Sequence, residues 1–78
     1  MIILVENVDN RWVYDGFVRE TDSPIPEQKE KICSYLECGL MNIVSKNIKK
    51  KYNITPKKLA VEFSESENNF EIIRIGTL

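Results

Sequence analysis

The chain has 78 residues, of which 42% are hydrophobic and 29% are charged, and its formal net charge is −1. This length supports one domain over residues 1–78, and the composition excludes a disordered chain. The longest apolar run, residues 2–5, is far shorter than the roughly 18 residues of a membrane-spanning helix. No signal-peptide pattern is visible, so we expect a cytoplasmic protein.

The first two predicted elements are strands joined by a tight turn. Residues 1–8 contain an unbroken apolar run, which suits a strand buried on both faces of a sheet. Asp9 and Asn10 interrupt the pattern, and both residue types tolerate the positive φ angles of a hairpin turn. Residues 11–20 are therefore predicted to form the returning strand, in which Gly16 marks a β-bulge.

One long helix is predicted over residues 26–52. Proline is tolerated in the first turn of a helix, so Pro26 suits its start. Apolar residues then recur at spacings of three and four and form one stripe: Ile32, Cys33, Leu36, Leu40, Ile43, Val44 and Ile48. Asn53 can take the left-handed conformation that ends a helix, and Pro56 prevents its continuation.

Two further strands close the predicted domain. Residues 59–64 alternate strictly, with large apolar side chains on one face of the strand. A polar turn over residues 66–69 follows, and a last strand over residues 70–78 carries apolar side chains on both faces.

The resulting order, ββαββ, predicts an α+β fold in which one long helix packs on one face of a four-stranded sheet. Since the first and last strands are the most apolar on both faces, we place them at the centre of the sheet. This arrangement resembles the β-grasp fold of ubiquitin-like domains, where those two strands lie parallel at the centre. The sequence lacks the terminal Gly-Gly pair of ubiquitin-type conjugation, so no conjugation role is expected. A fully antiparallel sheet is the alternative.

The closing strands carry a second resemblance. Leu59-Ala60-Val61-Glu62-Phe63, followed by Asn69-Phe70-Glu71-Ile72, is similar to the closing strands of the trypsin-co-occurring domain family. Those small domains also place a hairpin and a helix before these two strands. The resemblance implies an accessory module of prokaryotic conflict or defence systems, with no catalytic residues.

The residue types give little support to catalysis or to a metal or cofactor site. The chain has no histidine, the commonest general base, and no Gly-rich phosphate-binding loop. Cys33 and Cys38 lie five residues apart, which on a helix is a rise of about 7.5 Å and too far for a disulfide. We expect two reduced packing cysteines, no cofactor, no small-molecule substrate and no enzymatic activity. The acidic residues near the last turn lack the pattern of a calcium loop and are expected to be solvated: Glu62, Glu65, Glu67 and Glu71.

The sheet face away from the helix gives the leading functional prediction. That face is expected to be polar, yet the strands carry large apolar side chains at both parities. Aromatic residues on an open face are typical of protein interfaces. We expect a small non-enzymatic protein-interaction module that contacts another protein or self-associates, and the size and composition also fit a phage or mobile-element inhibitor that docks to a host enzyme. The predicted contacts are Trp12, Tyr14, Phe17 and Ile73.

The alternative function is nucleic-acid binding through a lysine cluster. The cluster contains no acidic residue and consists of Lys46, Lys49, Lys50, Lys51, Lys57 and Lys58. Such a cluster can contact phosphate backbones or an acidic protein surface. It also matches the preference of the negative end of a helix dipole for positive charge. Because the whole chain is slightly acidic, with a pI near 5.4, we rank nucleic-acid binding second.

Overall fold

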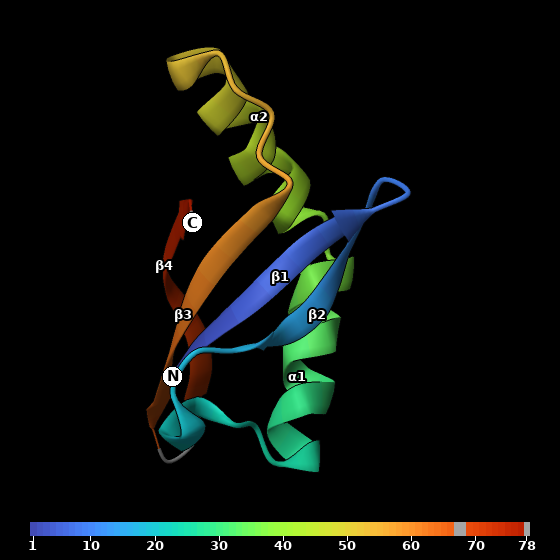
Figure 1. Ribbon diagram of the computed structural model, residues 1–78. Coiled ribbons are helices and arrows are strands. Elements are labelled where there is room, and N and C mark those ends of the chain that lie inside the picture. The colour runs from blue at the N-terminus through green and yellow to red at the C-terminus, as the bar shows by residue number, and fades with distance from the viewer. Residues whose placement is uncertain (67–68, 78) are drawn as a thin grey trace.

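The computed structural model describes residues 1–66 and 69–77. Its elements are β1 (Ile2–Val8), β2 (Arg11–Phe17), a short 3-10 helix (Glu20–Asp22), α1 (Pro26–Glu37), α2 (Leu40–Tyr52), β3 (Lys58–Ser66) and β4 (Asn69–Thr77), as Figure 1 shows. The α+β class and the four strands are confirmed. Part of the predicted turn over residues 66–69 lies outside the described residues. The final residue of the predicted last strand, Leu78, also lies outside them.

The four strands form one sheet in the order β2-β1-β3-β4, and every neighbouring pair is antiparallel. The fully antiparallel alternative is therefore observed. The predicted β-grasp order is not, because β3 occupies the place beside β1 that we gave to the last strand. β4 lies at the edge, where it pairs with β3 alone.

A bulge in β4 explains why its sequence suggested burial on both faces. Phe63 pairs with Ile72 whereas Glu62 pairs with Arg74, so Ile73 is an extra residue in the ladder. The bulge shifts the alternation by one residue, and apolar side chains of both parities then reach the same face of the sheet. Apolar residues at both odd and even positions of β4 therefore indicate a bulge and not a central position in the sheet.

The first hairpin has the predicted turn, but β2 ends at Phe17 rather than at the predicted residue 20, and the 3-10 helix begins at Glu20. Asp9 and Asn10 have φ angles of 51° and 65°, the positive values of a two-residue hairpin turn. The register shifts where Leu4 faces Gly16 and Val5 faces Tyr14. The bulge predicted at Gly16 is confirmed.

The predicted single helix is two helices. α1 ends at Glu37, and Gly39 adopts the left-handed conformation, with φ of 85°, before α2 begins at Leu40. A residue without a Cβ takes this conformation at little cost and ends a helix there. The three- and four-residue spacing of apolar side chains continues across the break, so periodicity alone did not show it. The helix stop predicted at Asn53 is confirmed, with φ of 56°.

The core lies between one sheet face and α1. It consists of Ile3, Val5, Trp12, Ile32, Leu36, Met41, Leu59, Val61, Phe63 and Phe70. In Figure 1, α1 runs behind the sheet, whereas α2 extends beyond the end of the sheet. Among the described residues of α2, Met41 is the only fully buried one. No helix in the described part of the chain is long and apolar enough to cross a membrane.

Candidate functional site

The four predicted interface residues do not share one surface. Trp12 is only 6% exposed and belongs to the core. Tyr14 pairs with the buried Val5, so it also faces the helices. Burial raises the pKa of its hydroxyl, and the ammonium of Lys29 lies 4.9 Å from its ring centre.

Phe17 and Ile73 lie at opposite edges of the sheet, on β2 and β4. Phe17 is 37% exposed and Ile73, the bulge residue, is 59% exposed. The prediction that Trp12 and Tyr14 lie on the open face is wrong, because in β2 the open-face position belongs to the exposed Val13. The aromatic side chains of β2 alternate onto the face that packs against the helices, whereas Val13 lies on the opposite, open face.

The open sheet face carries short and charged side chains instead. A hollow of about 430 Å³ is lined there by Ile2, Ala60, Glu62, Arg74, Gly76 and Thr77. The guanidinium of Arg74 and the carboxylate of Glu62 form an ion pair of 3.2 Å across it. No aromatic side chain lines this hollow, so it lacks the aromatic anchors that are common at the centre of protein interfaces.

The lysines of the predicted cluster lie on α2 and on the chain that follows it. Four of them lie on α2, Lys57 lies on the segment that returns to the sheet, and Lys58 is the first residue of β3. All six are exposed. Lys58 forms an ion pair of 3.8 Å with Asp15, and no other lysine of the cluster has one within the part of the chain that the structure describes.

We call residues 40–58, comprising α2, the returning segment and Lys58 at the start of β3, the lysine arm. Figure 1 shows α2 extending past the sheet and the chain turning back from its end toward β3. Three large apolar side chains of the arm are more than half exposed: Ile43 at 59%, Tyr52 at 60% and Ile54 at 53%. The lysines were visible in the sequence, but their projection from the domain was not, because it depends on the break at Gly39.

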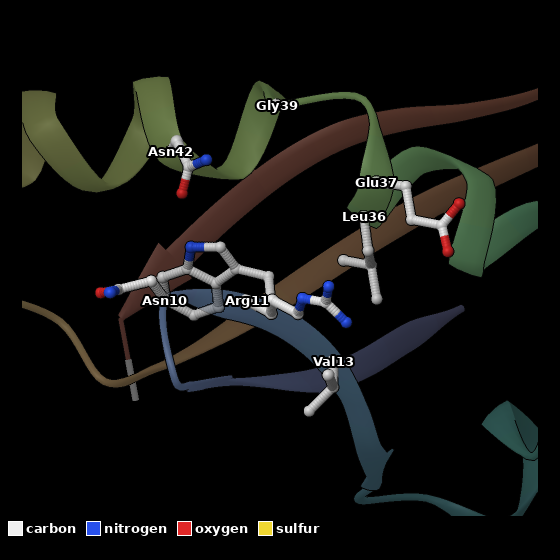
Figure 2. A pocket seen from close by; sticks show the side chains of 8 residues that line it. Asn10, Arg11, Val13, Leu36, Glu37, Gly39 and Asn42 are labelled. Atoms are coloured by element: carbon white, nitrogen blue, oxygen red, sulfur yellow. The ribbon is translucent and has the colours of Figure 1, made fainter.

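A cavity of about 430 Å³ lies between β2 and the α1–α2 break (Figure 2). β2 and its turn contribute Asn10, Arg11, Trp12 and Val13, and the helices contribute Leu36, Glu37, Gly39 and Asn42. Figure 2 shows the Asn42 side chain extending from α2 toward the β2 side of the cavity. The indole nitrogen of Trp12 is buried and has no hydrogen-bond partner among the described residues. A hydrogen-bond acceptor that reached this N–H would offset a desolvation cost of about 1–3 kcal/mol.

Both cysteines are free and exposed, so the prediction that they are packing residues is wrong. Neither side chain lies on the core-facing side of α1, which presents Ile32 and Leu36. The Cys38 thiol donates to the Tyr35 carbonyl at 2.9 Å, beside the helix break. Over residues 1–66 and 69–77, no group of three or more Cys, Asp or Glu side chains is placed to hold a metal ion.

Comparison with protein-family models, with curated proteins and with solved structures gives no match. The resemblance to the trypsin-co-occurring domain family therefore stays a prediction. Any functional assignment rests on the lysine arm, the cavity and the sheet edges themselves.

Proposed function

We propose that this chain is a small non-enzymatic protein-interaction module whose lysine arm docks to an acidic surface of another protein. The observation that carries the proposal is the position of the arm: α2 extends beyond the end of the sheet, and the arm exposes six lysines and three large apolar side chains. Protein interfaces combine apolar anchors with charges that complement the partner.

Charge within the arm supports an acidic partner. Lys49 and Lys50 follow Lys46 by three and four residues, so all three lie on one side of α2. Like charges at these spacings destabilise a helix by about 0.2–0.5 kcal/mol per pair. An acidic partner surface relieves this repulsion and also steers the encounter.

Exposed apolar side chains favour a protein over a phosphate backbone. Ile43 and Ile54 are aliphatic, and the ring of Tyr52 lies 5.3 Å from the ammonium of Lys51. Full burial of a large apolar side chain contributes about 1.5–3 kcal/mol, which a protein surface can provide. Phosphates and sugars provide far less apolar surface.

Nucleic-acid binding through the same lysines is the second candidate. It is favoured by the five lysines that lack an ion pair with any described residue. In that case affinity falls steeply with salt, with a slope of about −0.9 per neutralised phosphate on double-stranded DNA.

A paired-variant capture experiment separates the two candidates. The tagged protein is used to capture material from a lysate of its native host, with and without nuclease. The variant Lys49→Gln/Lys50→Gln removes charge from the arm, and Lys29→Gln/Lys31→Gln removes the same charge from α1 as the matched control. A third variant, Ile43→Ser, removes an apolar contact and no charge.

For a protein partner we expect one nuclease-resistant protein, lost with both arm variants and retained with the α1 control. For nucleic acid we expect loss of all bound material on nuclease treatment and no effect of Ile43→Ser. Retention of the partner by both arm variants would contradict any role of the arm.

A further inference from the structure

The free edge of β2 borders the cavity beside the α1–α2 break. β2 is the outermost strand of the sheet on its side. Arg11, Trp12 and Val13 are consecutive residues of this strand and all line the cavity, together with Leu36 and Glu37 from the end of α1. The cavity therefore runs along an edge strand, with a helix forming its other wall.

The backbone groups at this edge can be assigned from the ladder. Asn7 faces Trp12 across the β1–β2 pair, but the Asn7 amide donates to the Lys57 carbonyl on the opposite side, at 2.8 Å. Asn7 and Trp12 are thus a non-hydrogen-bonded pair, whose backbone groups point away from each other. The N–H and C=O of Trp12 point out of the sheet, and those of Tyr14, two residues further, do the same.

None of these four backbone groups is hydrogen-bonded to a described residue outside the sheet ladder. An edge of this kind accepts an additional strand through main-chain hydrogen bonds, and an adjoining pocket then selects the side chain. The bulge that follows Tyr14 interrupts the regular backbone of β2. The free edge is therefore short, and only a short additional strand can pair with it.

From this edge and cavity, we propose that the protein binds an extended peptide segment of a partner protein as a fifth strand on β2. The peptide residue opposite Trp12 places its side chain into the cavity, and a hydrogen-bond acceptor on that side chain takes up the unpaired indole N–H of Trp12. Asn42 is exposed and makes no side-chain hydrogen bond to a described residue, so it can move aside. The site adjoins the lysine arm at Asn42 but includes none of its lysines, and it does not depend on the function proposed for the arm.

The first step of the test selects a phage-displayed library of random short peptides on the full chain, with counter-selection on the variant Asn42→Phe. The added ring fills the cavity from an exposed helix position. Asn47→Phe, at another exposed position of α2, is the matched control. The most enriched peptide is then synthesised with a dye label, and its affinity is measured by fluorescence anisotropy.

We expect Asn42→Phe to weaken binding by about tenfold or more, as for loss of an anchored side chain, and Asn47→Phe to leave it within about twofold. Trp12→Phe, which keeps an aromatic ring but removes the N–H, weakens binding as well. Lys49→Gln/Lys50→Gln has no comparable effect, which separates this site from the arm.

The second step uses amide spectra and hydrogen exchange with the same peptide. The backbone amides of Trp12 and Tyr14 and the indole N–H of Trp12, the single tryptophan of the chain, should shift on binding. Trp12 and Tyr14 should also gain exchange protection, whereas Arg11 and Val13 change little because their amides already face β1. The proposal is overturned if no peptide is enriched over the Asn42→Phe background, or if a bound peptide protects other amides and leaves these two unchanged.

Discussion

The hydroxyl of Tyr35 in α1 donates a hydrogen bond of 2.5 Å to the backbone carbonyl of Phe70 in β4. The Tyr35 ring also lies 5.6 Å from the ring centre of Phe63, and Phe63 stacks on Phe70 at 4.6 Å. Since β4 pairs with one strand alone, this group of three aromatic residues ties the edge strand to the helix layer.

Replacing Tyr35 by phenylalanine keeps the ring and removes the hydroxyl. We expect a loss of about 1 kcal/mol in the free energy of unfolding, the usual contribution of one hydrogen bond. Urea denaturation measures the loss, and hydrogen exchange should show the largest decrease in protection along β4. Equal loss of protection in β1 would contradict a specific role at the edge strand.

Gly39 provides the break that directs α2 away from the sheet. Because its φ is 85°, Gly39→Ala should lower the free energy of unfolding by about 1–2 kcal/mol. Gly76→Ala is the control, since its φ is not positive and an added Cβ there meets no atom within 4 Å. Thermal denaturation of the two variants compares them, and equal stability would mean that the break does not require glycine.

Trp12 is a core residue, and its replacement should be costly without any partner. Trp12→Ala is expected to lower the free energy of unfolding by about 3–5 kcal/mol, as for other large buried side chains. Ile73→Ala, at the exposed bulge, should change it by about 0.5 kcal/mol or less. Denaturant titrations of both variants test this ranking, and the reverse order would place Trp12 at the surface.

Asp22 makes stability depend on pH. The Arg19 side chain donates to its carboxylate at 2.7 Å, and this hydrogen bond holds the pKa of Asp22 below its ordinary value, although burial opposes the shift. A pKa that is lower in the folded state adds stability above the unfolded value of about 3.9. That stability is lost as pH falls through the folded pKa. Unfolding measured between neutral and strongly acidic pH should show this loss in the wild type, and Asp22→Asn should remove it.

Local turn and cap chemistry was predictable from sequence because single residues determine it. Asp9 and Asn10 adopt the positive φ angles that their types tolerate, and Asn53 ends α2 as expected. The strict alternation of β3 likewise gave its buried face, with Leu59, Val61 and Phe63 inside.

The position of β4 in the sheet and the direction of α2 were not predictable in the same way. Each depends on one residue that lies within an otherwise regular pattern of apolar side chains. The bulge at Ile73 gave β4 the mixed parity of a central strand, and Gly39 interrupted a helix without interrupting its apolar periodicity. The lysine cluster could be identified from the sequence alone, as a group of positive charges with no acidic residue between them. Their exposure on an arm, and the cavity beside Trp12, required the three-dimensional arrangement.

Site-specific photo-crosslinking tests docking through the lysine arm most directly. A photoreactive phenylalanine analogue is placed at Tyr52, which is 60% exposed on the arm, and separately at Val18, which is 73% exposed and lies outside it. In lysate of the native host, we predict a discrete protein adduct from position 52, lost in the Lys49→Gln/Lys50→Gln background, and none from position 18. An adduct with nucleic acid, or a protein adduct from position 18 alone, would contradict docking of a partner protein on the arm.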